Sequence, residues 1–280
     1  MVSALGLGAM PMSVREVNDE ALGMRAIHEA LDLGITFIDT ADAYSPDEET
    51  FGHNEELVAR ALASYGESTD HVLVATKGGH TRRGTDWELD GSPAHLRSAC
   101  EASLRRLGGD AIGLYQHHRP DPKVPYAETI GGLRDLLEAG LIVKAGISNA
   151  DPEQIRLAHG ILGDGLAAVQ NQYSPKYRSS EPELELCAAM GLAFLPWSPL
   201  GGMSEAGELG SAFAVFGEVA DTYGVSPQQV CLAWELAKSP VVVPIPGASR
   251  PETIADSARA ASLKLADSDL ARLDRAARET

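Results

Sequence analysis

The chain is short of basic residues, of cysteine and of long apolar runs. Its 280 residues include 23 lysines and arginines against 40 aspartates and glutamates, which gives a formal net charge of −17 at pH 7. So acidic a chain lacks the positive field with which proteins bind nucleic acids or acidic membranes, so neither partner is expected. An anionic ligand would have to be held by local positive groups or by helix N-termini.

Cysteine occurs at only three positions, Cys100, Cys187 and Cys231. Their odd number, wide spacing and apolar neighbours favour buried free thiols in a reducing compartment over a disulfide framework or a zinc site. No run approaches the roughly 18 apolar residues of a membrane-spanning helix. The first residues also lack the basic and apolar regions of a signal peptide. We therefore expect a cytoplasmic protein that makes no membrane contact.

What the sequence does contain is a regular alternation of short apolar runs with amphipathic segments. Such alternation is typical of parallel βαβ units, and eight units in a chain of this length predict an α/β fold of the (β/α)₈ barrel (TIM barrel) type. No linker, composition change or repeat divides the chain, so residues 1–280 are expected to form a single domain. The expected strands are residues 4–8, 36–41, 72–77, 112–118, 142–148, 167–172, 193–197 and 241–245.

An open doubly wound sheet is the alternative architecture. If it bound a dinucleotide, that fold would be expected to carry a Gly-x-Gly-x-x-Gly turn after the first strand. The chain has only the first half of that motif, Gly6-Leu7-Gly8, and Pro11 stands where a helix should begin. The barrel is therefore favoured, with Asn18 as the expected N-cap of its first helix.

Ionisable side chains stand at the ends of several expected strands, where barrels of this kind carry their active sites. Asp39 and Lys77 end successive strands, which are expected neighbours, His118 ends the next strand, and Tyr44 follows Asp39 in a loop. Taken singly, the Asp39–Lys77 pair would be a rim salt bridge, Tyr44 a packed loop ring and His118 a satisfied core histidine. Four such residues at matching places favour one shared site.

These residue types suit proton transfer to a carbonyl group. Tyrosine has a pKa near 10, and a nearby ammonium lowers that pKa by stabilising the phenolate. Lys77, held charged by Asp39, is the expected source; a lowering of roughly three pH units takes about 4 kcal/mol. A neutral His118 could orient a carbonyl oxygen. Because side chains alternate across a strand, only one of His117 and His118 can face the barrel mouth, and the pattern does not decide which.

The chain resembles the aldo-keto reductase family over nearly its whole length. The matching segments are GLGAM (6–10), FIDTADAY (37–44), TK (76–77), SLRRL (103–107), LYQHHRPD (114–121), GISN (146–149), PWSPLG (196–201) and PIPGA (244–248). The resemblance implies reversible, NADPH-dependent reduction of an aldehyde or ketone, with no metal. It implies a catalytic tetrad of Asp39, Tyr44, Lys77 and His118; His118 is chosen over His117 because the family histidine directly precedes Arg-Pro-Asp.

The resemblance also implies a set of cofactor contacts. Ser148, Asn149 and Gln170 would hold the nicotinamide carboxamide, and Trp197 would stack on the nicotinamide ring. The turn before the helix that opens at Pro251, together with Arg250, is a reasonable site for the adenosine 2′-phosphate. The remaining contacts implied are Ser198, Leu200 and Gly201 around the pyrophosphate, Gly247 and Ser249 in that turn, Asp256 at the adenine, and Gly8 and Met10.

Two features depart from the family pattern. Gly247, Ala248, Thr253 and Ser257 stand where many members carry Lys, Ser, Arg and Asn, which leaves Arg250 as the main charged candidate for the 2′-phosphate. The chain also begins almost at its first expected strand. The hairpin that usually closes the barrel bottom is therefore expected to be absent or truncated.

Two other functions remain open. Some similar barrels are catalytically weak NADP(H)-binding regulatory subunits of channels, since fold does not fix function. A metal-dependent hydrolase would use His117, His118 and Asp39, but it leaves Lys77 and Tyr44 without a role. The candidate pocket residues are Trp87, Arg119, Tyr126 and Tyr177. The sequence identifies neither the carbonyl substrate nor the oligomeric state, for which a monomer suffices.

Overall fold

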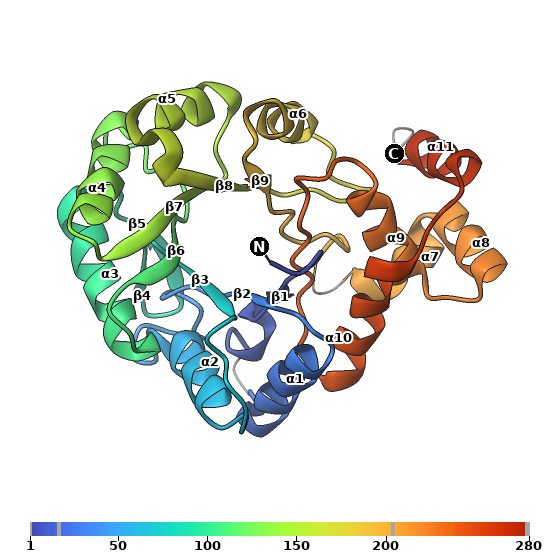
Figure 1. The fold of residues 1–280 in the computed structure, drawn as a ribbon, viewed down its shortest axis with the longest axis horizontal. Coiled ribbons are helices and arrows are strands. Elements are labelled where there is room, and N and C mark those ends of the chain that lie inside the picture. The colour runs from blue at the N-terminus through green and yellow to red at the C-terminus, as the bar shows by residue number, and fades with distance from the viewer. Residues whose placement is uncertain (1, 16–17, 203–204, 278–280) are drawn as a thin grey trace.

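The computed structural model describes residues 2–15, 18–202 and 205–277. Parallel strands curl around a common centre, and helices cover their outer side (Figure 1). No helix in these ranges is long and apolar enough to cross a membrane. The strands, in their order around the sheet, are β1 (Leu7–Gly8), β2 (Phe37–Asp39), β3 (Leu73–Gly78), β6 (Ile112–His117), β7 (Ile142–Ser148), β8 (Leu166–Gln170) and β9 (Ala193–Phe194).

Residues 241–248 take the eighth position without forming a regular strand. On one side the backbone N–H of Val243 donates to Phe194 at 2.9 Å, and on the other Gly6 donates to Pro244 at 2.8 Å. Pro244 and Pro246 have no N–H, which interrupts the ladder that the expected strand 241–245 would need. The expectation of a regular strand there is wrong, but the hydrogen bonds still close the ring, and the (β/α)₈ barrel is confirmed.

Helices follow the strands in the expected alternation. Ser92, Asp151 and Ser226 each cap a helix that has proline in its first turn. The expected cap at Asn18 is wrong by one residue, because the side chain of Asp19 accepts from the Leu22 N–H. The helices are α1 (Glu20–Asp32), α2 (His53–Ala63), α3 (Pro93–Leu107), α4 (Tyr126–Glu138), α5 (Pro152–Leu162), α6 (Glu181–Met190), α7 (Leu209–Ala212), α8 (Ala214–Tyr223), α9 (Pro227–Leu236), α10 (Pro251–Ala258) and α11 (Asp267–Ala276).

An antiparallel hairpin that the sequence pattern does not predict lies between β3 and α3. Its strands are β4 (His80–Arg83) and β5 (Asp86–Leu89), joined by a turn in which Gly84 adopts a positive φ of 57°. The hairpin carries Trp87, whose side chain is 43% exposed despite its size.

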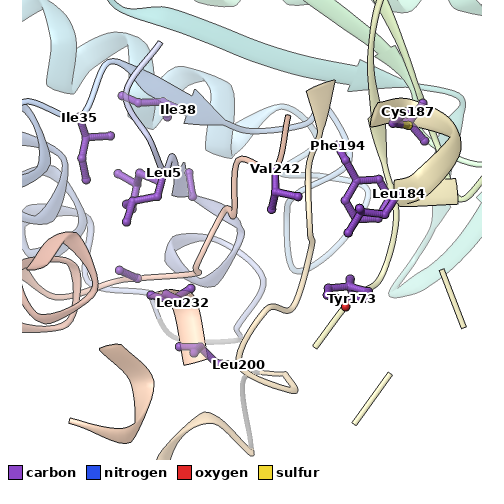
Figure 2. Close-up of a cluster of buried hydrophobic side chains, with 14 of the residues drawn as sticks. Leu5, Ile35, Ile38, Tyr173, Leu184, Cys187, Phe194, Leu200, Leu232 and Val242 are labelled. Carbon is purple, nitrogen blue, oxygen red and sulfur yellow. The ribbon is translucent and has the colours of Figure 1, made fainter. Parts of the chain in front are cut away.

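Two apolar clusters fill the molecule. The larger one lies between strands and helices, and Figure 2 shows part of it, where Leu184 and Cys187 of α6 lie beside Phe194 of β9. All three cysteines are buried free thiols, as expected. The smaller cluster takes one buried side chain from each of six barrel segments: Phe37, Ala75, Leu114, Ala168, Leu195 and Ile245.

Candidate active site

The site begins where the smaller apolar cluster ends. Side chains two residues apart on a strand share a face, so the residues two positions beyond the cluster point to the same side. From Phe37, Ala75 and Leu114 this step leads to Asp39, Lys77 and Gln116, which are buried and polar. A further step from Gln116 leads to His118. The inner layer thus changes from apolar to polar and ionisable at the carboxyl ends of the strands.

Lys77 connects two of the other predicted catalytic residues. Its fully buried ammonium donates to Asp39 Oδ1 at 2.5 Å, to the Thr40 carbonyl at 2.8 Å and to Tyr44 Oη at 3.1 Å. The three donors of the ammonium therefore each have an oxygen acceptor, which is the condition for burying such a charge at acceptable cost.

Asp39 is held from its other side by two amides. Its Oδ2 accepts from Gln170 Nε2 at 2.7 Å and from Gln116 Nε2 at 3.2 Å. Gln116 is a site residue that the sequence reasoning missed, although its position two residues before His118 was the signal that could have found it.

Burial decides the protonation of Tyr44. It raises the pKa of the phenol above its usual value, while the Lys77 ammonium acts in the opposite direction without prevailing. The expected net lowering of this pKa by Lys77 is therefore wrong for this structure. Burial opposes the charge on Lys77, but the Asp39 carboxylate and Tyr44 outweigh it and raise the pKa of the ammonium. At neutral pH the pair is a phenol beside an ammonium.

The two neighbouring histidines face opposite ways. His118 packs edge-on against Tyr44, with ring centroids 5.6 Å apart, and lines the central cavity. His117 packs against Tyr126 of α4 outside that cavity. Burial, reinforced by the Lys77 charge, lowers the pKa of His118 well below 6.5, so its ring is neutral at pH 7. No group of three or more His, Cys, Asp or Glu side chains in the described ranges is placed to hold a metal ion.

A cavity of about 1150 Å³ opens above this layer and extends to the start of α10. Asp39, Tyr44 and His118 line it, while Lys77 lies beneath them and is fully buried. Of the thirteen expected cofactor residues, the cavity is lined by Gly8, Met10, Ser148, Asn149, Gln170, Trp197, Ser198, Leu200, Gly247, Ser249, Arg250 and Asp256. The thirteenth, Gly201, lines a neighbouring cavity of about 340 Å³ instead.

Several of these residues already have partners. Ser148 Oγ donates to the Gln170 carbonyl at 2.7 Å, and Asn149 Nδ2 donates to the His118 carbonyl at 3.0 Å. Both Asp256 oxygens accept from α9 or its cap, one from Ser226 and one from Gln229, at 2.6 Å each. Asp256 therefore also fixes α10 against α9, a role that its sequence context did not indicate.

Backbone strain gathers at the cavity wall. Among the described residues, only Asn149 and Ser198 combine a side chain with a positive φ, of 57° and 50°, and both line the cavity. Left-handed backbone is uncommon for residues with a Cβ and concentrates at ligand-binding sites. The strain is thus an indication of function that does not depend on the expected residue roles.

The candidate pocket residues divide into two groups. Trp87 and Arg119 line the cavity; Tyr126 and Tyr177 do not. The cavity also takes residues that the sequence reasoning missed, chiefly Arg15 in the loop before α1 and His80 on β4. Neither belongs to a segment with a recognisable strand end, so no periodic signal marked them.

Comparisons with known proteins agree with this geometry. A model of the aldo/keto reductase family matches residues 4–278. The probable aldo-keto reductase 1 of Glycine max is 34% identical over 298 residues, covering 96% of this chain and 84% of the relative. The structure of the glycerol dehydrogenase AKR11B4 from Gluconobacter oxydans matches with a TM-score of 0.84 and 28% identity, covering 99% of this chain and 92% of that one. An aldo/keto reductase from Klebsiella pneumoniae, in complex with NADP and acetate, matches with a TM-score of 0.80 and 28% identity, covering 98% and 91%.

Proposed function

The chain belongs to the aldo/keto reductase family, and on that premise we propose that it is an oxidoreductase that reduces an aldehyde or ketone with NADPH. The observation that carries the proposal is the contact of the buried Lys77 ammonium with both Asp39 and Tyr44 beneath the cavity. A purely structural salt bridge would not need a tyrosine hydroxyl as its third partner at the mouth of the barrel.

The residues around the cavity fit a phosphorylated dinucleotide. Gly8 and Gly247 let β1 and residues 241–248 approach closely at the cavity wall, since an added Cβ would lie 2.9 Å from the Ile245 carbonyl oxygen at Gly8 and 2.8 Å from Pro11 at Gly247. Arg250 forms no ion pair with a described residue and directly precedes α10. A guanidinium beside a helix N-terminus is suited to a phosphate. Trp197 is half-buried at the cavity, and its buried Nε1 has no partner among the described residues. That the Klebsiella pneumoniae relative was solved with NADP supports this cofactor. NADPH, when bound, supplies a hydride to the carbonyl carbon.

The chain's own residues manage the proton and the carbonyl oxygen. Tyr44 donates the phenolic proton to that oxygen, which suits a group whose pKa is raised and which stays protonated at neutral pH. Lys77 fixes the hydroxyl at 3.1 Å and stabilises the phenolate that remains. His118, neutral and edge-on to Tyr44, orients the oxygen by a hydrogen bond. Asp39 keeps Lys77 charged.

The proposal is tested by measuring carbonyl-dependent oxidation of NADPH together with NADPH binding. We expect turnover of simple aldehydes and a saturable fluorescence change on titration with NADPH. Binding without turnover of any of a broad panel of aldehydes and ketones would contradict the proposal and favour a regulatory cofactor-binding subunit. Absence of binding would contradict the cofactor assignment itself.

The preference for NADPH over NADH is proposed to depend on Arg250. Loss of a charge-assisted contact to the 2′-phosphate should weaken NADPH binding by roughly tenfold or more and leave NADH binding unchanged. Arg250→Ala is compared with Arg259→Ala, which removes an exposed arginine from the opposite end of α10. Equal affinities of the parent and Arg250→Ala for NADPH would contradict the assignment.

A further inference from the structure

We propose that the substrate is a carbonyl compound that carries a carboxylate, and that Arg119 binds this carboxylate and selects for it. The inference rests on the proposed carbonyl reduction and adds the class of substrate. Three observations support it: Arg119 lies in the cavity, Arg119 has no partner among the described residues, and other charged groups at this end of the cavity already have partners.

Arg119 directly follows His118 and lines the same cavity as Tyr44 and Trp87. Its side chain is exposed, and no residue in the described ranges hydrogen-bonds to it or pairs with it. Other arginines on this side of the barrel are engaged: Arg82 donates to the carbonyls of Ser45 and Thr85, and Arg83 pairs with Glu88. Arg119 is thus a free guanidinium next to the residue proposed to orient the carbonyl.

At the substrate end of the cavity, Arg119 is a cation without an acidic partner in the described ranges, in a chain of net charge −17. Burial lowers the pKa of His80 to about 4, and the charges of Arg119, Arg82 and Lys77 act in the same direction. The carboxylates of Asp47 and Asp86 act on Arg82, so the cation at this end that has no acidic partner in the described ranges is Arg119. The one carboxylate of the tetrad, Asp39, is already paired with Lys77 at 2.5 Å. A negative charge on a ligand is attracted here even though the molecule as a whole repels it.

The shape of this end suits a flat apolar group between the carbonyl and the carboxylate. Trp87 stands edge-on to Tyr44 at 6.5 Å and to His80 at 5.2 Å, and the Arg82 guanidinium lies 3.9 Å from the centre of the indole ring. The indole is thereby held beside the proposed proton donor. A substrate with its oxygen at Tyr44 and His118 and its body along Trp87 can present its carboxylate to Arg119, whose planar fork matches that group.

The test compares para-formylbenzoate with its methyl ester, which has the same ring and aldehyde without the charge. The parent protein should show kcat/KM higher for the acid by roughly tenfold. Arg119→Ala should remove this preference mainly through KM, while Arg83→Ala, on the hairpin but outside the cavity, should keep it. Equal kcat/KM for the two aldehydes in the parent, or the same loss for both in Arg119→Ala, would overturn the inference.

Binding of para-toluate, which has no aldehyde, separates this inference from the proposed reaction. Calorimetry should detect its binding to the NADP⁺-loaded parent and a loss of roughly tenfold or more in Arg119→Ala. If neither aldehyde is reduced, carbonyl reduction is contradicted, and the toluate titration still decides the role of Arg119. Equal affinity of the parent and Arg119→Ala for para-toluate would overturn the proposal that Arg119 binds the carboxylate.

Discussion

Lys77 is the residue on which the proposed chemistry depends. Its ammonium has no solvent exposure and makes three contacts, to a carboxylate, a carbonyl and a phenol. Removing the partner of a buried charge is strongly destabilising, whereas replacing the whole pair by neutral groups often is not. The contribution of the Asp39–Lys77 pair to stability can therefore be measured separately from its contribution to turnover.

Lys77→Met should lose about 3–5 kcal/mol of unfolding free energy, because it leaves the Asp39 carboxylate buried without its cation. Adding Asp39→Asn should restore most of that stability but none of the turnover. Urea denaturation and NADPH-dependent carbonyl reduction measure the two effects. A single variant as stable as the parent, or an active double variant, would show that the pair does not act as described.

The pH dependence of the reaction follows from Tyr44 and His118. The pKa of Tyr44 is raised above 10 and that of His118 is lowered well below 6.5, so neither group titrates in between. Carbonyl reduction at saturating substrate should be flat from about pH 6 to about pH 9. Alcohol oxidation needs the phenolate and should rise with pH over the same interval. A rise or fall of the reduction rate centred near pH 7 would contradict the protonation states assigned to Tyr44 and His118.

The sequence predicted which residues form the site, but it did not predict the direction in which the pKa of Tyr44 is shifted. Strand ends brought Asp39, Tyr44, Lys77 and the His117–His118 pair together as candidates, and the family resemblance chose His118. The structure places the four residues around one cavity edge. The direction of the Tyr44 pKa could not be predicted in this way. It depends on how completely the ring is buried, which is a property of the packed loop and not of the residues beside it.

At the level of elements, the junction between β1 and residues 241–248 closes the barrel and borders the proposed cofactor end of the cavity. A Cβ on Gly8 would lie 2.9 Å from the carbonyl oxygen of Ile245, a backbone atom that cannot rotate away. Glycine is therefore required at this position by the close approach of two backbones.

Gly8→Ala should destabilise the fold by about 1–3 kcal/mol and weaken NADPH binding, because the two backbones must move apart. Gly160→Ala is the matched control: no atom lies within 4 Å of its added Cβ, and an alanine in α5 should be neutral or stabilising by about 0.5–1 kcal/mol. Thermal unfolding and NADPH titration of both variants give the comparison. A Gly8→Ala protein as stable as the parent would refute the close approach.

The elements that the sequence predicted poorly are those fixed by contacts distant in the chain. The hairpin β4–β5 lies against Tyr44 and His118 through Trp87 and His80, which come from distant parts of the chain, although Gly84 in its turn was a local signal that could have found it. Residues 241–245 were predicted as a strand from their apolar run, but Pro244, Pro246 and hydrogen-bond partners on both sides determine the form of residues 241–248. Regular strands such as β7, in contrast, were predicted with their observed bounds.

For the whole molecule, acid stability should be limited by buried neutral histidines. Both ring nitrogens of His117 are buried and have no partner among the described residues, and burial lowers the pKa of this ring to about 4. Because the folded state resists protonation, the unfolded state binds more protons below pH 6.5. Stability is therefore complete above that pH and falls as the pH drops to about 4.

His117→Asn should remove this pH dependence, which amounts to about 3 kcal/mol between the two pKa values. Urea denaturation near pH 7 and near pH 4 should show a smaller acid-induced loss in the variant than in the parent. An identical loss in the two proteins would mean that His117 does not contribute.

The overall architecture could be predicted without knowing the state of any buried histidine, since eight alternating strand and helix units already indicated the barrel.

In a molecule of net charge −17, the cavity is lined by three arginines together with the carboxylates of Asp39, Glu252 and Asp256. Arg15, Arg119 and Arg250 all line the cavity, and none forms an ion pair with a described residue. Net charge could be counted from the sequence, but which arginines remain unpaired at the cavity could not, because pairing is decided by the fold.

The most direct test of the central claim is the turnover of Tyr44→Phe, measured together with its affinity for NADPH. We expect a loss of roughly 10²–10⁴-fold in carbonyl reduction, because a general acid is removed, with NADPH affinity unchanged. Tyr126→Phe, which changes a half-buried tyrosine outside the cavity, should keep its turnover. Undiminished carbonyl reduction by Tyr44→Phe would contradict Tyr44 as the proton donor and with it the mechanism proposed for this site.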